Sequence, residues 1–196
     1  MQPIKLLHRL YIDFTAMKYF LKYFLICLLL FPAALYAQSS DEEVLQWNAN
    51  RKLSWTDYKA KPNPESDAAA STTTYLGISY NITTNDFSYT IESRFSKTRS
   101  WGLHKTPYIL SHEQGHFDIS EIFARKLNKK MHEYRFDRKT YQKDLKKIYQ
   151  DILNEKEEMQ DDYDTETNHS INKEKQAEWL KRIAKMLEEY KEFDNY

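Results

Sequence analysis

The segment from Leu110 to Asp118 contains the pattern H-E-x-x-H within a run of apolar periodicity. On an α-helix His112 and His116 are four residues apart, so both imidazoles leave the same face and can converge on one metal ion. Glu113 projects beside them, where it can take a proton from water without being a ligand. Two His and one further protein ligand suit Zn²⁺, which then lowers the pKa of a bound water to about 7. The segment predicts a helix with a hydrolytic zinc site; two His on a charged helix face are the alternative.

Residues 17–37 have the features of a secretory signal peptide. Lys18 and Lys22 form a short positive region, and residues 23–35 are an almost unbroken apolar run. Residues 33–37 offer small side chains suited to cleavage before Gln38. The apolar run is shorter than the about 20 residues that span a bilayer comfortably. An uncleaved N-terminal anchor is the alternative to cleavage.

We therefore expect residues 1–37 to be a signal peptide, with Met17 as the true start and residues 1–16 as an artefact. Residues 38–196 are long enough for a single domain with its own core. Cys27 is the only cysteine and lies inside the signal. After cleavage, neither a disulfide nor a cysteine zinc site is available. The expected location is secreted or periplasmic.

The charge of the chain is balanced, with 29 Lys and Arg against 29 Asp and Glu. Basic and acidic residues are interspersed, which gives no argument for nucleic acid as a partner. We expect a peptide or protein substrate, and no stable membrane insertion once the signal is removed.

A β-hairpin is predicted before the motif helix. Residues 72–82 and 87–95 each place apolar side chains on one face, and Asn85 with Asp86 supplies the turn between them. Residues 39–49 are interpreted as a polar lead-in.

Three amphipathic helices are predicted after the hairpin, over residues 108–134, 141–163 and 173–193. The polar stretch 163–170 is rich in residues that favour turns and is predicted to separate the last two helices. Gly115 is unfavourable within a helix by about 1 kcal/mol relative to Ala; its expected use is the close approach of another backbone or a substrate, and a tolerated glycine is the alternative. The predicted fold class is α+β, a small antiparallel N-terminal sheet packed on three long helices.

The spacing does not identify the third metal ligand. Asp118 and Glu121 lie about 240° and 180° around the helix from His112, so they are excluded. Asp118 is better interpreted as a structural group. The remaining candidates lie elsewhere in the chain, and His169 in the polar stretch is preferred among them; the others are His104, Glu157 and Glu166.

Several motifs belong together. They are R-x-L-x-W-x-D-Y at residues 51–58, S-W at 100–101, L-x-H-E-Q-G-H-F-D-I-x-E at 110–121, Y-D-x-x-T-x-H at 163–169 and Q-x-x-W at 176–179. Their arrangement resembles the bacterial family called domain of unknown function 922, described as predicted secreted zinc-dependent proteases. The resemblance extends from about Trp47 to Leu187. The chain has Ser170 where this family usually has Gly, in the loop that carries His169.

The resemblance implies a zincin-like zinc metallopeptidase with Glu113 as the general base and Zn²⁺ on His112 and His116. It also favours His169 as the third ligand and suggests Tyr163 as a catalytic hydrogen-bond donor to the oxyanion. His104 is the alternative donor. The expected function is therefore a secreted zinc-dependent peptidase. The alternatives are a non-catalytic metal-binding or interaction module at the cell surface, and a cell-wall peptide amidase.

Overall fold

The structure is a computed structural model that describes residues 42–84 and 86–196. Glu42–Tyr196 forms one compact unit. The predicted signal peptide, residues 1–37, lies outside the described residues. Among the described helices, none has the length and apolar character needed to cross a membrane.

The main sheet has three antiparallel strands in the order β1-β4-β3. β3 (Thr74–Ile82) and β4 (Phe87–Ser96) form the predicted hairpin, which is confirmed. β1 (Val44–Gln46) pairs with the end of β4, so the predicted lead-in contains a short strand. A second sheet joins β2 (Ala70–Ser71) to β5 (Trp101–Gly102).

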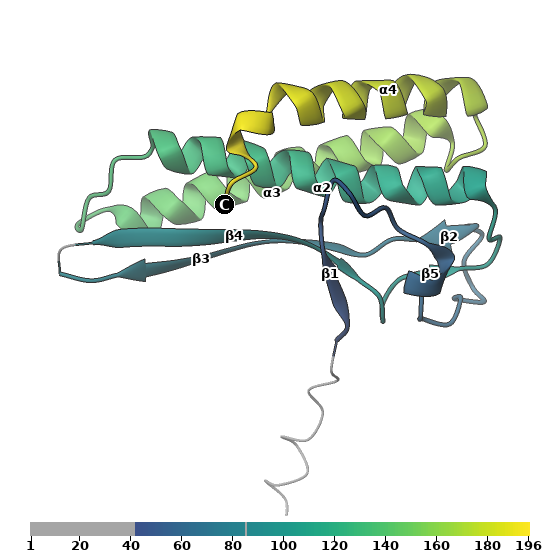
Figure 1. Cartoon of the computed structure of the whole chain (residues 1–196), viewed down its shortest axis with the longest axis horizontal. Helices are drawn as coiled ribbons and strands as arrows, with labels where there is room; N and C mark the ends of the chain where they lie inside the picture. The colour runs from purple at the N-terminus through teal and green to yellow at the C-terminus, as the bar shows by residue number, and fades with distance from the viewer. Residues whose placement is uncertain (1–41, 85) are drawn as a thin grey trace, which may run out of the picture. The chain divides into compact units, whose positions relative to one another are not determined.

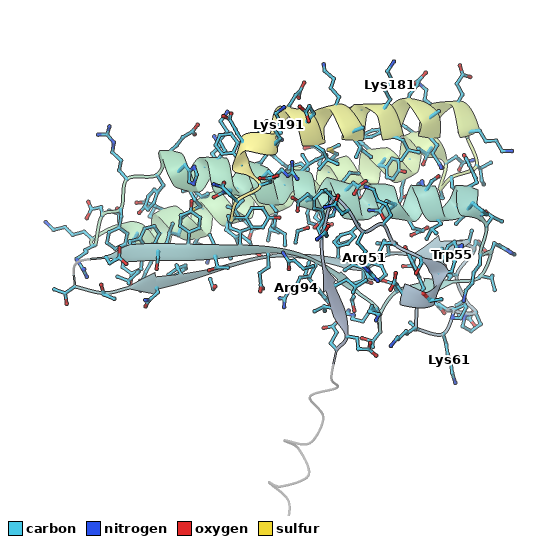
Figure 2. All side chains as sticks on the ribbon, in the orientation of Figure 1. Arg51, Trp55, Lys61, Arg94, Lys181 and Lys191 are labelled. Atoms are coloured by element: carbon cyan, nitrogen blue, oxygen red, sulfur yellow. The ribbon has the colours of Figure 1, made fainter. Side chains whose placement is uncertain are left out.

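The alternation along the hairpin decides which face is covered. Leu76, Ile91 and Phe95 point to the helices and are buried, because successive side chains of a strand leave opposite faces. Arg94, next to Phe95, lies on the face away from the helices (Figure 2). The hairpin thus has one apolar side, as the sequence predicts.

Three helices pack together on this apolar side (Figure 1). They are α2 (Pro107–Glu133), α3 (Tyr141–Thr167) and α4 (Lys173–Glu189), followed by the 3₁₀ turn Lys191–Phe193. The fold class is therefore α+β, small antiparallel sheets on three long helices, as predicted. The outer face of α4 is solvated, and Lys181 points away from the other helices (Figure 2).

The first turn of α2 has both signals expected of a helix start. Thr106 accepts a hydrogen bond from the backbone N–H of Ile109 at 3.1 Å, and Pro107 occupies the first turn, where it loses no helical hydrogen bond. α2 is the central helix, since it contacts the hairpin, α3 and α4. Its buried apolar side chains include Ile119, Ile122, Phe123 and Leu127.

The predicted end of the second helix is wrong. α3 continues through residues 163–167, which the sequence places in a polar break. Tyr163 is completely buried, and Thr167 donates a hydrogen bond to its carbonyl at 2.6 Å. Burial of one aromatic ring therefore outweighs the turn preference of its polar neighbours. The extension places Asp164 on a helix rather than in a loop.

Candidate metal centre

Three potential ligand atoms from two helices meet in a tight triangle. His112 Nε2 lies 3.2 Å from His116 Nε2, and Asp164 Oδ1 lies 3.0 Å and 3.1 Å from these two atoms. Ligands at the usual Zn²⁺ distances in tetrahedral geometry are roughly 3.3 Å apart. Two imidazole nitrogens and a carboxylate oxygen also form a donor set that suits zinc. The three residues therefore fit a divalent metal ion.

The triangle follows from the packing of α2 against α3. The two helices are joined by residues 134–140 and pack side by side in opposite directions (Figure 1). A step of four residues forward on α2 therefore matches a step of four residues back on α3. His112 lies opposite Asp164, and His116 lies opposite Gln160.

Gln160 determines the orientation of the His116 ring. Its side-chain N–H donates to the His116 carbonyl at 3.0 Å, so its Oε1 is the acceptor for His116 Nδ1–H at 2.6 Å. With the proton on Nδ1, a neutral His116 presents the lone pair of Nε2 to the triangle. A hydrogen bond on the distal nitrogen is the usual support of a metal-binding histidine.

The His112 ring is oriented by packing. The Tyr163 ring stacks on it with a centroid distance of 4.5 Å and an interplanar angle of 21°. The Tyr163 hydroxyl donates to the His112 carbonyl at 3.2 Å. Gly115 makes this approach possible, because a Cβ there would lie 2.8 Å from Tyr163 Cζ. A close approach at Gly115 is present, but its partner is the Tyr163 side chain and not the expected backbone or substrate.

Glu113 lies next to the triangle and is held from the other wall of the site. Thr72 donates a hydrogen bond to Glu113 Oε2 at 2.7 Å, and the Tyr58 hydroxyl lies 2.9 Å from Thr72 Oγ1. Because Thr72 donates to the carboxylate, Tyr58 is the donor to Thr72. This chain of hydroxyls fixes one carboxylate oxygen and leaves Oε1 for other partners.

The site favours positive charge. Burial raises the pKa of Asp164, but hydrogen bonds from His112 and His116 and the charges of these rings outweigh it, so its pKa lies below the usual range. Burial lowers the pKa of His116, but the hydrogen bond to Asp164 and the negative charge of Glu113 raise it overall. Two carboxylates beside two imidazoles thus attract a proton or a metal cation.

The triangle opens into a cleft of about 600 Å³. Residues 68–74, which include β2 and the first residue of β3, form one wall, and α3 supplies another. Glu113 and the three candidate ligands all line this cleft. The polar groups are therefore accessible to a molecule that enters from solvent.

A comparison with protein families matches residues 34–170 to bacterial proteins of unknown function, DUF922. The chain belongs to the DUF922 family. This confirms the family that the sequence motifs indicate, and the match includes both helices of the metal centre. No curated protein and no solved structure matches the chain.

The remaining site predictions can be placed in this DUF922 fold. His169 lines the cleft with its Nδ1 at 3.6 Å from Asp164 Oδ1, but its side chain is 67% exposed and lies outside the triangle. Asn168, His169 and Ser170 have left-handed φ values of 48°, 50° and 72°. Such a turn is unusual for residues other than Gly, and within it the His169 backbone N–H donates to the Asp164 carbonyl at 2.9 Å. The role of His169 as a ligand stays a prediction.

Tyr163 is fully buried, and its hydroxyl contacts the His112 backbone. This geometry favours a positioning role, and the oxyanion role stays a prediction. His104 is exposed in the loop before α2. Glu157 lines the cleft, whereas Glu166 accepts a hydrogen bond from Trp179 at 2.9 Å.

The acidic residues that helical geometry excludes as ligands have structural partners. Asp118 accepts hydrogen bonds from Trp47 and Gln114, each at 2.8 Å. This is the structural role predicted for it, since it fastens the N-terminal segment to α2. Glu121 is buried against Arg125 at 2.8 Å.

Sequence reasoning gave no role to Asp164, Gln160 or Thr72. The spacing of Gln160 and Asp164 could have indicated a role for both. They are four residues apart, like His112 and His116, so they share one face of their helix. No comparable signal exists for Thr72, because its contact with Glu113 joins residues 41 positions apart.

Gly115→Ala is expected to lower the free energy of unfolding by up to about 2 kcal/mol, because overpacking a buried site costs about 1–3 kcal/mol. The overlap with Tyr163 outweighs the about 1 kcal/mol that Ala gains in a helix. Urea denaturation measures the change. Gly77→Ala is the matched control, because a Cβ there meets Glu92 at 3.8 Å, an ordinary contact. A Gly115→Ala protein as stable as the wild type would contradict the close packing.

Proposed function

We propose that this protein is a secreted or periplasmic zinc-dependent peptidase. The observation that supports the proposal is the triangle of His112, His116 and Asp164 with Glu113 beside it in an open cleft. A purely structural metal site needs no adjacent free carboxylate and no cleft. Zn²⁺ held there would supply a Lewis acid that makes water a nucleophile near neutral pH.

Residues of the protein transfer the proton and hold the imidazoles in position. Glu113 accepts the proton of the attacking water at Oε1, because Thr72 occupies Oε2. The hydroxide attacks the peptide carbonyl carbon, the C–N bond breaks, and Glu113 passes the proton to the leaving amine. Gln160 and Tyr163 hold the two imidazoles in place during these steps.

We propose Asp164 as the third ligand. Its Oδ1 lies within 3.1 Å of both imidazole nitrogens, whereas the His169 ring places its Nδ1 3.6 Å from Asp164 Oδ1 and outside the triangle. His169, the ligand predicted from the sequence, then lies beside the metal as an exposed group that can contact a substrate.

A peptide substrate is supported by the form of the cleft. Residues 68–74 line one wall as seven consecutive residues, and two of them form the strand β2. The side chains of Ala68, Ala69 and Ala70 in this wall are short, which leaves space in the cleft for a peptide substrate. The same zinc chemistry would serve cell-wall peptides, so the amidase remains the second hydrolytic candidate.

Purified protein is expected to contain about one zinc ion per chain by elemental mass spectrometry, and to cleave a degenerate peptide library. 1,10-Phenanthroline should remove both the zinc and the cleavage, and added Zn²⁺ should restore both. Zinc without cleavage of proteins, peptide libraries or peptidoglycan peptides would indicate the non-catalytic module. Cleavage that persists after complete removal of zinc would contradict the proposal.

A further inference from the structure

Lys156 is a buried lysine in the wall of the cleft. The residue is 5% exposed and lies on α3 among the cleft-lining side chains. Lysine is almost never buried to this degree without a partner. Its ammonium donates to Glu157 Oε1 at 2.6 Å, and the Glu157 side chain is itself 65% exposed. The partner of this buried cation is therefore a carboxylate that can turn to solvent.

Lys156 shares a helix face with the metal centre. Gln160 and Asp164 follow it at intervals of four residues, which places Asp164 about 12 Å further along the helix. The Cα–Cβ bond of Lys156 tilts toward the helix N-terminus, so its side chain starts away from the metal centre. Since an extended peptide advances about 3.3 Å per residue, this separation corresponds to three or four substrate residues.

The cleft has acidic groups at both ends, and Glu157 is the carboxylate at the Lys156 end. Glu113 and Asp164 lie at the metal centre, and Lys156 is the single lysine or arginine among the described residues that line the cleft. Thr73 and Thr74 line the cleft from the opposite wall and carry neutral hydroxyls. Away from the metal centre, a negatively charged group on a bound molecule therefore has one lysine or arginine side chain of the cleft to pair with.

We propose that Lys156 is a specificity residue that selects peptides with a carboxylate three or four residues from the cleaved bond. Glu157 turns to solvent, and the substrate carboxylate takes its place at the ammonium. The carboxylate belongs to an Asp or Glu side chain or to the C-terminus of the peptide. The inference rests on the proposed function only for the position of the cleaved bond; selection of the carboxylate is a property of binding.

Binding and cleavage are measured separately. Fluorescent octapeptide libraries carry Glu or Gln at one fixed position and mixed residues elsewhere, each with a free or an amidated C-terminus. Fluorescence anisotropy with the Glu113→Gln protein reports binding, and kcat/KM of the wild type reports cleavage. We expect an about tenfold preference for the carboxylate at one position, the effect of a charge pair partly shielded from water. If the preference is lost when the C-terminus is amidated, the selected carboxylate is the C-terminus of the peptide. If the preference survives amidation, the selected carboxylate is a side chain. Both outcomes support the proposal.

Lys156→Met keeps the length of the stem and is expected to abolish the preference, whereas Lys156→Arg should retain it. Lys126→Met is the matched control, because Lys126 pairs with Glu155 at 3.1 Å and does not line the cleft. Its preference should equal that of the wild type.

Glu157→Gln provides a second test that leaves Lys156 in place. Removing the competing carboxylate should strengthen binding of the Glu library relative to the Gln library. The proposal would be overturned if the wild type showed no preference for the Glu library over the Gln library. It would also be overturned if this preference were unchanged in both Lys156→Met and Glu157→Gln. Preferential binding without any cleavage would overturn the peptidase function and leave the role of Lys156 standing.

Discussion

Glu113→Gln is expected to lower kcat for peptide hydrolysis by about 10²–10⁴-fold, the usual contribution of a positioned general base. The amide of Gln cannot accept the proton of water, but its oxygen can still accept the hydrogen bond from Thr72. Glu113 is not among the three atoms of the triangle, so the zinc content should remain at the wild-type level. Elemental analysis and a continuous assay with a cleaved library peptide measure the two quantities on the same sample.

Thr72→Val is the companion variant for this test. It removes the donor to Glu113 Oε2 while the base itself remains. We expect a smaller loss in kcat, about 10–100-fold, because a hydrogen bond to a charged group is worth about 1.5–3 kcal/mol. Hydrolysis that survives in Glu113→Gln at the wild-type rate would remove Glu113 as the base. Loss of zinc in that variant would instead make Glu113 a metal ligand.

Asp164→Ala is expected to weaken zinc binding by more than about 100-fold, because it removes a ligand rather than an outer partner, whose loss typically costs 10–100-fold. His169→Ala should weaken it by less than about tenfold. Competition with a chromophoric chelator at fixed pH measures both affinities. Asp161→Ala is the matched control, since Asp161 is an exposed carboxylate on the same helix.

The opposite ranking would restore the ligand set predicted from the sequence. If His169→Ala removes the metal and Asp164→Ala does not, Asp164 is a partner of the His rings and not a ligand. A large loss in both variants would give the ion four protein ligands and would argue against an open coordination position. Circular dichroism of each variant separates loss of the site from loss of the fold.

Local features could be predicted because they depend on neighbours in the sequence. The i, i+4 spacing places His112 and His116 on one helix face in any fold that keeps the helix. Alternation likewise predicts the hairpin over residues 72–82 and 87–95, where the structure has β3 (Thr74–Ile82) and β4 (Phe87–Ser96). In each case the period of the backbone decides where the side chain points.

Features that depend on distant partners could not be predicted in this way. β1 has only three residues, Val44–Gln46, which is too short for a period to be recognised, and it is a strand because the edge of β4 pairs with it. The end of α3 moves to Thr167 because Tyr163 finds a buried place against His112 and Gly115. The sequence of residues 163–170 favours turns and does not indicate that Tyr163 packs against another helix.

The sequence by itself determined the two imidazoles, the adjacent carboxylate and the class of fold, since helical and strand periodicity are local properties. Only the tertiary structure decided that Asp164 meets those imidazoles and that Thr72 holds Glu113. The physical reason is the packing of α2 against α3 and of the residues before β3 against α2. These contacts are established by burial of the shared core, and the spacing of residues along one segment does not encode them.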